Sequence, residues 1–361
     1  MSRSVATADT AAAVVPSTMR RAVVSVGSID VVDVPTPQPQ DNEVLVRSVV
    51  TGVCGSDTHA AHGRHPFIHL PYQPGHEVVG IVVRLGAGVD EVEVGTRVTV
   101  EPDLPCWTCK QCHNGKENLC ENMRFFGCVY DQGGMADYFT IPSNRLHIIP
   151  DDMSYRAAAL IEPLSTPVHA VRLAGGVKDK AVVIQGAGSI GLLLLSVVKA
   201  HGARTIVMTD PLPAKRERAR SLGADVTLDA MAPELVADAR SALGESADVV
   251  FDCVAVDATI NAAVGMATKG GTVMVVGVPA GPVSVPLPVI QDHQVRIQGS
   301  ATYLPEDYKE SIRLLAAGAI DVNSIVTSVI PLPQVADAFE QSLSGDHIKV
   351  LVTVDSASFD A

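Results

Sequence analysis

The sequence predicts an α/β protein that combines a β-rich domain with a doubly wound parallel sheet. Two textures along its 361 residues carry this prediction. Residues 19–150 consist of short Val-rich runs broken by Gly and Pro, which is typical of β-strands. From about residue 166, apolar strands alternate with helical patterns, which indicates βαβ units and helices on both faces of a sheet. A chain of this length has room for two domains and a sizeable core.

The β-rich part contains three clear strand candidates, at residues 44–46, 78–83 and 97–100. Before it, residues 1–18 are rich in Ala, Ser and Thr. We interpret them as a flexible extension, because their apolar run is too short for a secretory signal. We place the first domain at residues 19–165, with a cysteine-rich lobe at about 102–124.

The alternating part predicts strands at residues 181–184, 205–209, 247–254 and 271–276, and helices at 190–201 and 214–222. After residue 299 the pattern changes to an amphipathic helix at 305–317, ended by Gly318, and a strand at 347–354. This late return to β texture predicts that residues 301–361 rejoin the first domain. Residues 166–300 would then form an inserted, cofactor-binding domain.

Composition restricts the function. The formal net charge is -13, and such a surface repels nucleic acid and anionic membranes. No apolar run reaches the roughly twenty residues of a membrane span. The seven cysteines, four of them clustered, suit a reducing compartment better than a secreted disulfide scaffold. We therefore expect a cytoplasmic protein that acts on a small molecule, with no nucleic-acid or membrane partner.

Four cysteines occur in one short segment with the spacing C-x2-C-x2-C-x7-C. They are Cys106, Cys109, Cys112 and Cys120. Thiolates so close in the chain can converge on one ion, and Zn²⁺ takes four of them tetrahedrally in closed structural sites. The alternatives are two disulfides, which need an oxidising compartment, and an iron–sulfur cluster, which also uses close cysteine spacing. The pattern favours a structural zinc site.

A second motif, Gly-Ala-Gly-Ser-Ile-Gly at residues 186–191, has the G-x-G-x-x-G form. It follows an apolar strand and opens a helix, which is the context of a dinucleotide-binding βαβ unit. We expect Gly186 to make the tight turn and Gly188 to admit the pyrophosphate at the helix N-terminus. Gly191 would let helix and strand pack closely.

Asp210 follows the second predicted strand, nineteen residues after Gly191. A carboxylate at this position hydrogen-bonds the ribose hydroxyls and repels a 2′-phosphate, which favours NAD over NADP. Lys215 and Arg216 are the counter-argument, since a basic pair can accept that phosphate. We expect this pair to lie on the exposed face of the next helix.

Three further fragments carry side chains that bind metals. Cys54 lies in a Cys-Gly-Ser-Asp-Thr-His run, His76 and Glu77 in Gly-His-Glu, and Glu162 in an apolar Glu-Pro-Leu stretch. Thiolate, imidazole and carboxylate are the ligand types of a zinc centre that keeps one position open for substrate. Taken singly, each has an ordinary alternative: a core cysteine, a satisfied histidine, or a carboxylate at a helix end.

Together, and in this order, these motifs resemble the zinc-dependent medium-chain dehydrogenases. The resemblance extends from residue 19 to residue 354 and is strongest for the polyol branch (sorbitol, xylitol, idonate) and the butanediol dehydrogenases. It implies a GroES-like catalytic domain and a Rossmann domain, with the active site between them. It also implies two zinc ions per chain, NAD, and oxidation of a secondary alcohol to a ketone by hydride transfer.

The resemblance assigns roles to individual residues. Ser56 is expected to relay the proton of the substrate hydroxyl, and His59 to pass it toward solvent. The residues expected around the catalytic zinc are Cys54, His76, Glu77 and Glu162, where one or both carboxylates ligate the metal or hold its water. Those expected at the cofactor are Gly186, Gly188, Ile190, Gly191, Asp210, Thr166, Val276 and Gly277. We interpret Cys128 and Cys253 as core residues.

The sequence departs from part of the polyol branch at Thr302, where some members carry an Arg that contacts distal hydroxyls. The run through Tyr303 is instead similar to butanediol dehydrogenases. The substrate alternatives are therefore a polyol, a small vicinal diol or acyloin, and an amino alcohol as in threonine dehydrogenase. A non-catalytic cofactor-binding relative is the alternative from another class, but the complete set of polar ligands weighs against it.

Dehydrogenases of this kind are commonly homotetramers or homodimers, in which two Rossmann sheets join edge to edge. We expect a tetramer. The candidate segments for the join are residues 271–278 and 283–290. The second is apolar yet contains two prolines, which is typical of an edge or interface position.

Overall fold

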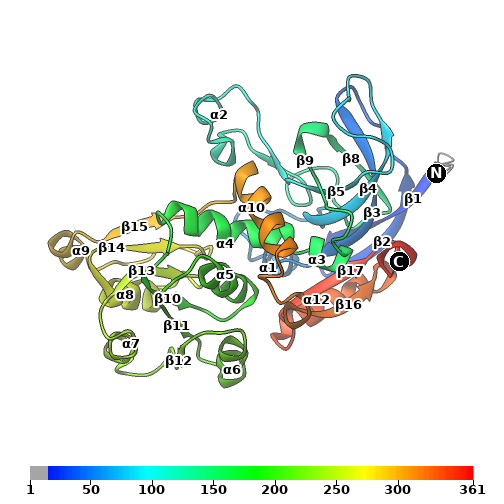
Figure 1. Ribbon diagram of the computed structural model, residues 1–361. Helices are drawn as coiled ribbons and strands as arrows, with labels where there is room; N and C mark the ends of the chain where they lie inside the picture. Colours follow the sequence, from blue (N-terminus) through cyan, green and yellow to red (C-terminus); the bar gives the residue numbers. More distant parts are fainter. Residues whose placement is uncertain (1–14, 361) are drawn as a thin grey trace, which may run out of the picture.

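The structure, a computed structural model, describes residues 15–360 (Figure 1). Most of the predicted extension therefore lies outside the described residues, and the first strand begins at Thr18. Figure 1 shows two lobes, with α4 (Ile161–Leu173) and α10 (Pro305–Ala316) lying against each other between them. Among residues 15–360, no helix combines the length and the apolar character needed to cross a membrane.

One lobe contains a six-stranded sheet in which every neighbouring pair is parallel. The strand order is β12-β11-β10-β13-β14-β15. This confirms the predicted parallel sheet. Its strands are β10 (Ala181–Gln185), β11 (Thr205–Thr209), β12 (Val226–Leu228), β13 (Ala247–Asp252), β14 (Ala267–Val275) and β15 (Arg296–Gly299).

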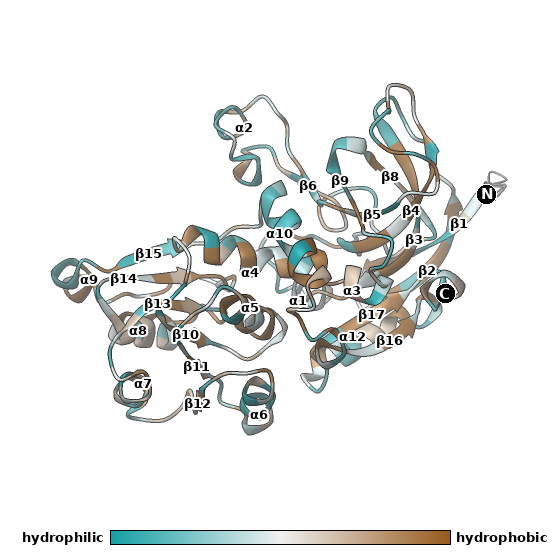
Figure 2. Ribbon diagram, viewed as in Figure 1, coloured by the Kyte–Doolittle hydropathy of each residue, from teal (hydrophilic) through white to brown (hydrophobic). Residues whose placement is uncertain are grey.

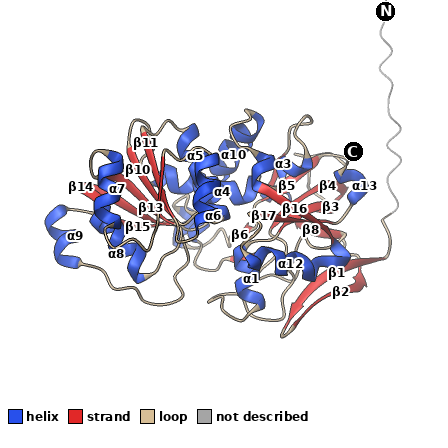
Figure 3. Ribbon diagram, turned by 90° about the horizontal axis from the view of Figure 1, so that it is seen from below, coloured by secondary structure: helices blue, strands red, loops and turns tan. Residues whose placement is uncertain are grey.

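Successive side chains of β10 point to opposite faces of this sheet, so each face packs on different helices. Val182 and Ile184 share a core with α5 and α6, whereas Ala181 and Val183 share one with α7 and α8. Figure 3 shows these two helix layers, and Figure 2 shows apolar strands between them. The helices are α5 (Ser189–Ala200), α6 (Pro213–Ser221), α7 (Leu235–Leu243), α8 (Asp257–Met266) and α9 (Leu287–His293).

The edge of the parallel sheet differs from the expectation. β14 is hydrogen-bonded to β13 on one side and to β15 on the other. Residues 271–278 are therefore not at an edge, because the chain turns through α9 and returns as β15 to cover them. The exposed edge next to the apolar segment 283–290 is β15.

The other lobe contains a seven-stranded sheet that draws strands from both ends of the chain. Its order is β16-β17-β3-β4-β5-β9, and β8 also pairs with β3. The late strand β17 lies antiparallel to β3, with Leu351 opposite Gly52. The strands are β3 (Glu43–Gly52), β4 (Glu77–Leu85), β5 (Arg97–Val100), β8 (Tyr138–Pro142), β9 (Leu146–Ile148), β16 (Val326–Pro331) and β17 (Lys349–Thr353).

Residues 103–125 form a separate protrusion, the four-cysteine lobe, which contains the helix α2 labelled in Figure 1. Its base is the antiparallel pair β6 (Asp103–Leu104) and β7 (Arg124–Phe125). Between them lie α2 (Lys110–His113) and the single 3₁₀ turn η1 (Glu117–Leu119).

Short elements complete the β-rich part. They are β1 (Thr18–Ser25), β2 (Ser28–Pro35), α1 (Gly55–Ala61), η2 (Ser143–Arg145), α3 (Tyr155–Ala158), α11 (Val322–Ile325), η3 (Leu332–Gln334), α12 (Val335–Ser344) and α13 (Ser356–Phe359).

The predicted helix after residue 304 is confirmed as α10. Pro305 lies at its first turn, where a missing N–H costs nothing, and Gly318 follows its end with φ of 68°. Tyr308 and Leu315 are buried on its inner face.

Candidate active site and metal centres

The sulfur atoms of Cys106, Cys109, Cys112 and Cys120 converge, with all four within 4.8 Å of one another. The Sγ atom of Cys109 lies 3.5 Å from that of Cys112 and 3.9 Å from that of Cys120. A tetrahedral zinc with Zn–S bonds of about 2.3 Å requires S···S separations of about 3.8 Å. Sulfurs at these separations are not bonded to each other, so the disulfide alternative fails.

Backbone amides of the four-cysteine lobe point at the sulfurs. The N–H of Cys106 donates to the Cys120 Sγ atom at 3.2 Å, and that of Asn122 donates to the same sulfur at 3.3 Å. The N–H of Glu121 lies 3.5 Å from the Cys109 Sγ atom. Backbone N–H groups of Cys112 and Glu121 lower the pKa of Cys109, and the thiolate is the form that ligates metal. The donor set therefore fits a closed zinc site.

Cys54, His76 and Glu77 form a second cluster, with ligand atoms within 4.8 Å of one another. Cys54 precedes α1, whereas His76 and Glu77 stand at the start of β4. Gly52, at the end of β3, makes room for this cluster. A Cβ atom on Gly52 would lie 1.8 Å from the Glu77 Oε2 atom, so a larger residue cannot occupy that position without displacing the carboxylate.

Glu77 is paired with Lys349, the first residue of β17. The Lys349 Nζ atom lies 2.6 and 2.8 Å from the two Glu77 carboxylate oxygens and donates to the Val53 carbonyl at 3.2 Å. Both side chains are buried. Burial by itself lowers the pKa of Lys349, but the Glu77 carboxylate outweighs burial and raises it. Lys349 therefore neutralises the carboxylate that belongs to this metal cluster.

His76 is fixed by groups on its far side. Its Nδ1 atom lies 3.4 Å from the Cys128 thiol and 4.0 Å from Asp57, and its ring meets Phe125 edge to face. This leaves Nε2 as the nitrogen available to a metal. Burial lowers the pKa of His76, whereas Cys128 and Asp57 together raise it well above its ordinary value. Cys128 is buried, as expected, but it also touches a predicted ligand.

Glu162, in the first turn of α4, lies outside that 4.8 Å cluster but close to it. Its carboxylate accepts a short hydrogen bond from the Tyr303 hydroxyl. Burial raises the pKa of Glu162 to about 7, with His76 and Glu77 contributing smaller, opposed effects. The structure thus brings three of the four predicted ligands together and holds the fourth nearby through Tyr303.

The expected proton-relay residues lie on one short helix. Ser56 and His59 are three residues apart on α1 and so share a face. Ser56 is half-buried and His59 is exposed to solvent. Thr166, expected at the nicotinamide, is half-buried on α4, one turn after Glu162.

The glycine-rich loop connects β10 to α5 with the expected geometry. Gly186 has φ of 93°, and Gly188 is the N-cap of α5. A Cβ atom on Gly191 would lie 1.8 Å from the Gly186 carbonyl oxygen, whereas one on Gly188 would meet nothing within 4 Å. The space in front of Gly188 is where a pyrophosphate would approach the helix N-terminus. Ile190 follows on the first turn of α5.

Two cavities flank this loop and together outline a dinucleotide path. One, of about 380 Å³, is lined by Gly186, Thr209 and apolar residues that include Met231 and Val254. The other, of about 120 Å³, lies between the two lobes, with Gly188 on one side and Gly55 on the other. The predicted Val276 and Gly277 follow β14. Gly277 lies so close to Cys253 that a Cβ atom would meet the Cys253 carbonyl carbon at 2.8 Å.

Asp210 is 5% exposed and holds the loop. Its two oxygens accept from the N–H groups of Ala187 and Leu212, each at 2.9 Å. The expectation that Lys215 and Arg216 lie on an exposed helix face is wrong. Arg216 is half-buried because its guanidinium donates to the carbonyls of Asp210 and Pro211, both at 2.8 Å, and Lys215 lines the cavity between the lobes.

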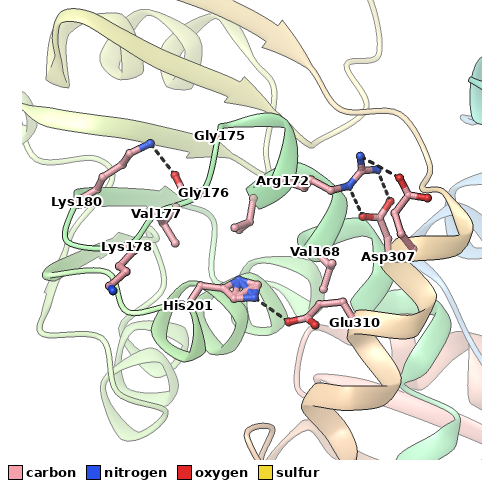
Figure 4. Close-up of a pocket in the computed structure, with 12 residues that line it drawn as sticks. Val168, Arg172, Gly175, Gly176, Val177, Lys178, Lys180, His201, Asp307 and Glu310 are labelled. Atoms are coloured by element: carbon pink, nitrogen blue, oxygen red, sulfur yellow. Dashed lines mark hydrogen bonds and ion pairs between the residues drawn. The ribbon is translucent and has the colours of Figure 1, made fainter.

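A larger cavity, of about 610 Å³, lies elsewhere, between α4, α10 and the end of α5 (Figure 4). Its apolar floor includes Val168, and none of its lining residues is a predicted site residue. Its rim is largely self-paired, since His201 meets Glu310 at 2.9 Å and Arg172 meets Asp307 at 2.8 Å. Most charged side chains around this cavity are therefore already paired, and it contains no predicted metal ligand.

Sequence reasoning missed several residues at the site. The structure adds three supporting residues that the sequence analysis did not assign to the site: Asp57, Lys349 and Tyr303. Asp57 had a signal, because it stands three residues after Cys54 and its carboxylate accepts the Cys54 N–H at 3.1 Å. Lys349 had none, since it sits in an apolar strand far along the chain.

Comparison with known proteins matches both lobes to family models. Residues 40–151 match the alcohol dehydrogenase GroES-like domain, and residues 189–317 match the zinc-binding dehydrogenase family. The chain is 34% identical to the sorbitol dehydrogenase of Gallus gallus, over 89% of this chain and 92% of that one.

Two solved structures are similar over most of their length. A zinc-binding dehydrogenase of Sinorhizobium meliloti bound to NADP has a TM-score of 0.87 and 32% identity, covering 94% of this chain and 100% of its own. The 2R,3R-butanediol dehydrogenase of Bacillus subtilis has a TM-score of 0.85 and 27% identity, covering 93% and 99%.

Proposed function

Because this chain belongs to the zinc-dependent medium-chain alcohol dehydrogenases, in their polyol branch, we propose that it oxidises a secondary alcohol of a polyol or vicinal diol to the ketone with NAD. Because it belongs to this family, the chain is an alcohol or polyol dehydrogenase. The observation that best supports the proposed reaction is the cluster of Cys54, His76 and Glu77, in which Cys54 stands between Val53 and Gly55, two residues that line the cavity between the lobes.

We propose two zinc sites per chain with different roles. The four thiols of the four-cysteine lobe form a closed set suited to a structural ion, whose ligation contributes to folding. The mixed set of Cys54, His76 and Glu77, with Glu162 beside it, suits a reactive ion with an open position. When bound, that ion lowers the pKa of a substrate hydroxyl, and the nicotinamide accepts the hydride.

The residues of this chain then transfer the proton and position the reacting groups. Ser56 accepts the proton of the substrate hydroxyl at its Oγ atom while giving up its own hydroxyl proton, and His59, exposed on the same helix face, releases a proton to solvent. Lys349 offsets the charge of Glu77, so the site does not accumulate two unpaired carboxylates. Tyr303 fixes the carboxylate of Glu162. These contacts hold the reacting groups in place, and such positioning lowers the activation barrier of the reaction.

NAD is the proposed cofactor. Gly188 and the N-terminus of α5 would hold the pyrophosphate, and Asp210 lies where the adenosine ribose would meet it. Arg216, which could accept a 2′-phosphate, is instead bonded to backbone carbonyls. These contacts of the Arg216 Nη1 atom support NAD over the NADP seen in the Sinorhizobium relative.

Thr302 favours a small diol as the second candidate substrate. A threonine reaches less far than the Arg that contacts distal hydroxyls in part of the polyol branch, and the Bacillus relative acts on butanediol. The deciding experiment is NADH absorbance with purified enzyme, NAD or NADP, and a panel of polyols, vicinal diols and threonine. Turnover of threonine alone, or no turnover of any polyol or diol, would contradict the proposal.

We also infer a cytoplasmic homotetramer. All seven cysteines are free thiols, four of them placed as metal ligands, which suits a reducing compartment. Beside the edge strand β15, Val278 and Leu287 are 63% and 65% exposed, and such an apolar patch next to an open edge favours pairing with a second copy. Light scattering at micromolar concentration tests this, and a stable monomer would overturn it.

A further inference from the structure

The four-cysteine lobe touches the segment that carries Tyr303. Asn118, in the η1 turn just before Cys120, is buried. Its side-chain Nδ2 atom donates to the Ala301 carbonyl at 2.9 Å, and its own backbone carbonyl accepts from the Thr302 hydroxyl at 3.4 Å. One residue of the lobe therefore holds two consecutive residues of a segment that is remote in the sequence.

The contacted segment has a backbone conformation that needs support. Thr302 has φ of 46°, in the left-handed region. A β-branched residue there is an outlier, because its Cβ substituents crowd the backbone. Such a residue persists only where surrounding contacts fix it. Asn118 supplies contacts on both sides of the peptide that links Ala301 to Thr302.

The next residue acts on the site. Tyr303 is 3% exposed, and its ring packs edge to face on Tyr308 with centroids 5.2 Å apart. Its hydroxyl donates to the Glu162 carboxylate. Since a change of φ at Thr302 would redirect the Tyr303 side chain, the backbone at Thr302 determines whether this hydrogen bond forms.

A second set of contacts connects the four-cysteine lobe to Tyr308, the residue on which Tyr303 packs. The Arg145 guanidinium lies 5.0 Å from the centroid of the Trp107 ring and pairs with Glu101 at 2.8 Å. Glu101 also pairs with His147, whose ring stacks on Tyr308 at 4.6 Å. Figure 1 shows the α2 lobe on the same side of the molecule as the connection from β15 to α10, which Asn118 contacts.

We propose that Asn118 is a positioning residue for the dehydrogenase reaction, which holds Thr302 in its left-handed conformation and so aims Tyr303 at Glu162. The four-cysteine lobe is then part of the active-site framework as well as a folding element. The inference rests on the proposed function, because Glu162 matters through that reaction.

Asn118→Ala removes the side-chain donor and leaves the cysteines intact. We expect kcat/KM for the alcohol to fall about five- to tenfold, the effect of losing roughly one net hydrogen bond, while KM for NAD changes less than about twofold. Asn114→Ala is the matched control, because Asn114 is exposed on the same lobe. An equal loss in Asn114→Ala, or a parallel rise in KM for NAD, would overturn the proposal.

Glycine adopts positive φ without help, so Thr302→Gly tests the strain argument. In the Thr302→Gly background, Asn118→Ala should cost less than half of its effect in the wild type. Fully multiplicative effects would show that the two residues act independently. If Asn118→Ala does not fold, Thr302→Val removes the hydroxyl, which contacts Asn118 and also faces Asp103, and unchanged kinetics in that variant would count against the proposal.

Two measurements do not depend on turnover. Hydrogen exchange of residues 300–304 should become faster in Asn118→Ala, while strands of the parallel sheet stay protected. Emission of Trp107, the single tryptophan, should be unchanged, because the lobe itself stays folded. Unchanged exchange at 300–304 refutes the positioning role. A wild type inactive on every alcohol refutes only the proposed function, and the exchange result still decides the inference.

Discussion

Lys349 and Glu77 form an ion pair from which water is almost completely excluded, with exposures of 2% and 1%. Replacing Lys349 by Met keeps the length of the side chain and removes its charge. The Glu77 carboxylate then loses the donor that contacts both of its oxygens. Breaking a buried pair from one side typically costs about 3–5 kcal/mol, because an uncompensated charge remains.

We therefore expect Lys349→Met to lower the free energy of unfolding by about 3–5 kcal/mol. With an unfolding entropy of about 2.1 cal/mol/K per residue over the whole chain, the midpoint temperature should fall by about 4–7 °C. Urea denaturation followed by circular dichroism, with metal content measured in parallel, gives the first quantity. Calorimetry gives the second.

Two further variants test the reasoning. Glu77→Gln in the Lys349→Met background removes the orphaned charge, so the double variant should recover at least about 2 kcal/mol. Lys269→Met is the matched surface control, since Lys269 and its partner Asp292 are 72% and 71% exposed at 3.8 Å. It should change stability by less than about 0.5 kcal/mol. A loss below about 1 kcal/mol in Lys349→Met, or a double variant less stable than the single one, would refute the reasoning.

Four other variants have distinct expected outcomes. Cys54→Ser should abolish turnover and retain one zinc of two by metal analysis, whereas Cys109→Ser should chiefly lower stability; one zinc in the wild type would contradict both. Asp210→Ala should raise KM for NAD more than KM for NADP. A wild type that already prefers NADP would show that Asp210 does not set the cofactor preference. Asp307, despite burial, has its pKa lowered by hydrogen bonds from His169 and Arg172. A depressed carboxyl pKa contributes stability above the unfolded value of 3.8 that is lost as pH falls through the folded value. The free energy of unfolding of Asp307→Asn should therefore depend less on pH below about pH 4 than that of the wild type. An identical pH dependence in the two proteins would exclude this role.

Local patterns carried much of the prediction. The four cysteines lie within fifteen residues, so their spacing alone constrains them to one centre. The glycine-rich loop is equally local, because the close approach of Gly191 to the Gly186 carbonyl depends on the six residues from Gly186 to Gly191. Alternating apolar strands and helices likewise specify the parallel sheet through their period.

Contacts between residues far apart in the chain could not be predicted from such local patterns. Nothing in the apolar strand around Lys349 reveals that its ammonium meets Glu77. Likewise, the sequence around Arg216 does not reveal that its guanidinium donates to backbone carbonyls. The edge of the sheet also followed from β15 returning beside β14, not from the apolar content of residues 271–278.

The sequence by itself determined the types of side chain available for metal and dinucleotide, because those motifs are short and their geometry is set by neighbouring residues. Only the tertiary structure decided which groups support them: Lys349 at Glu77, Cys128 at His76, and Tyr303 at Glu162. These contacts join residues far apart in the chain. Their energies depend on burial and on exact placement, which arise only when the sheets and helices pack.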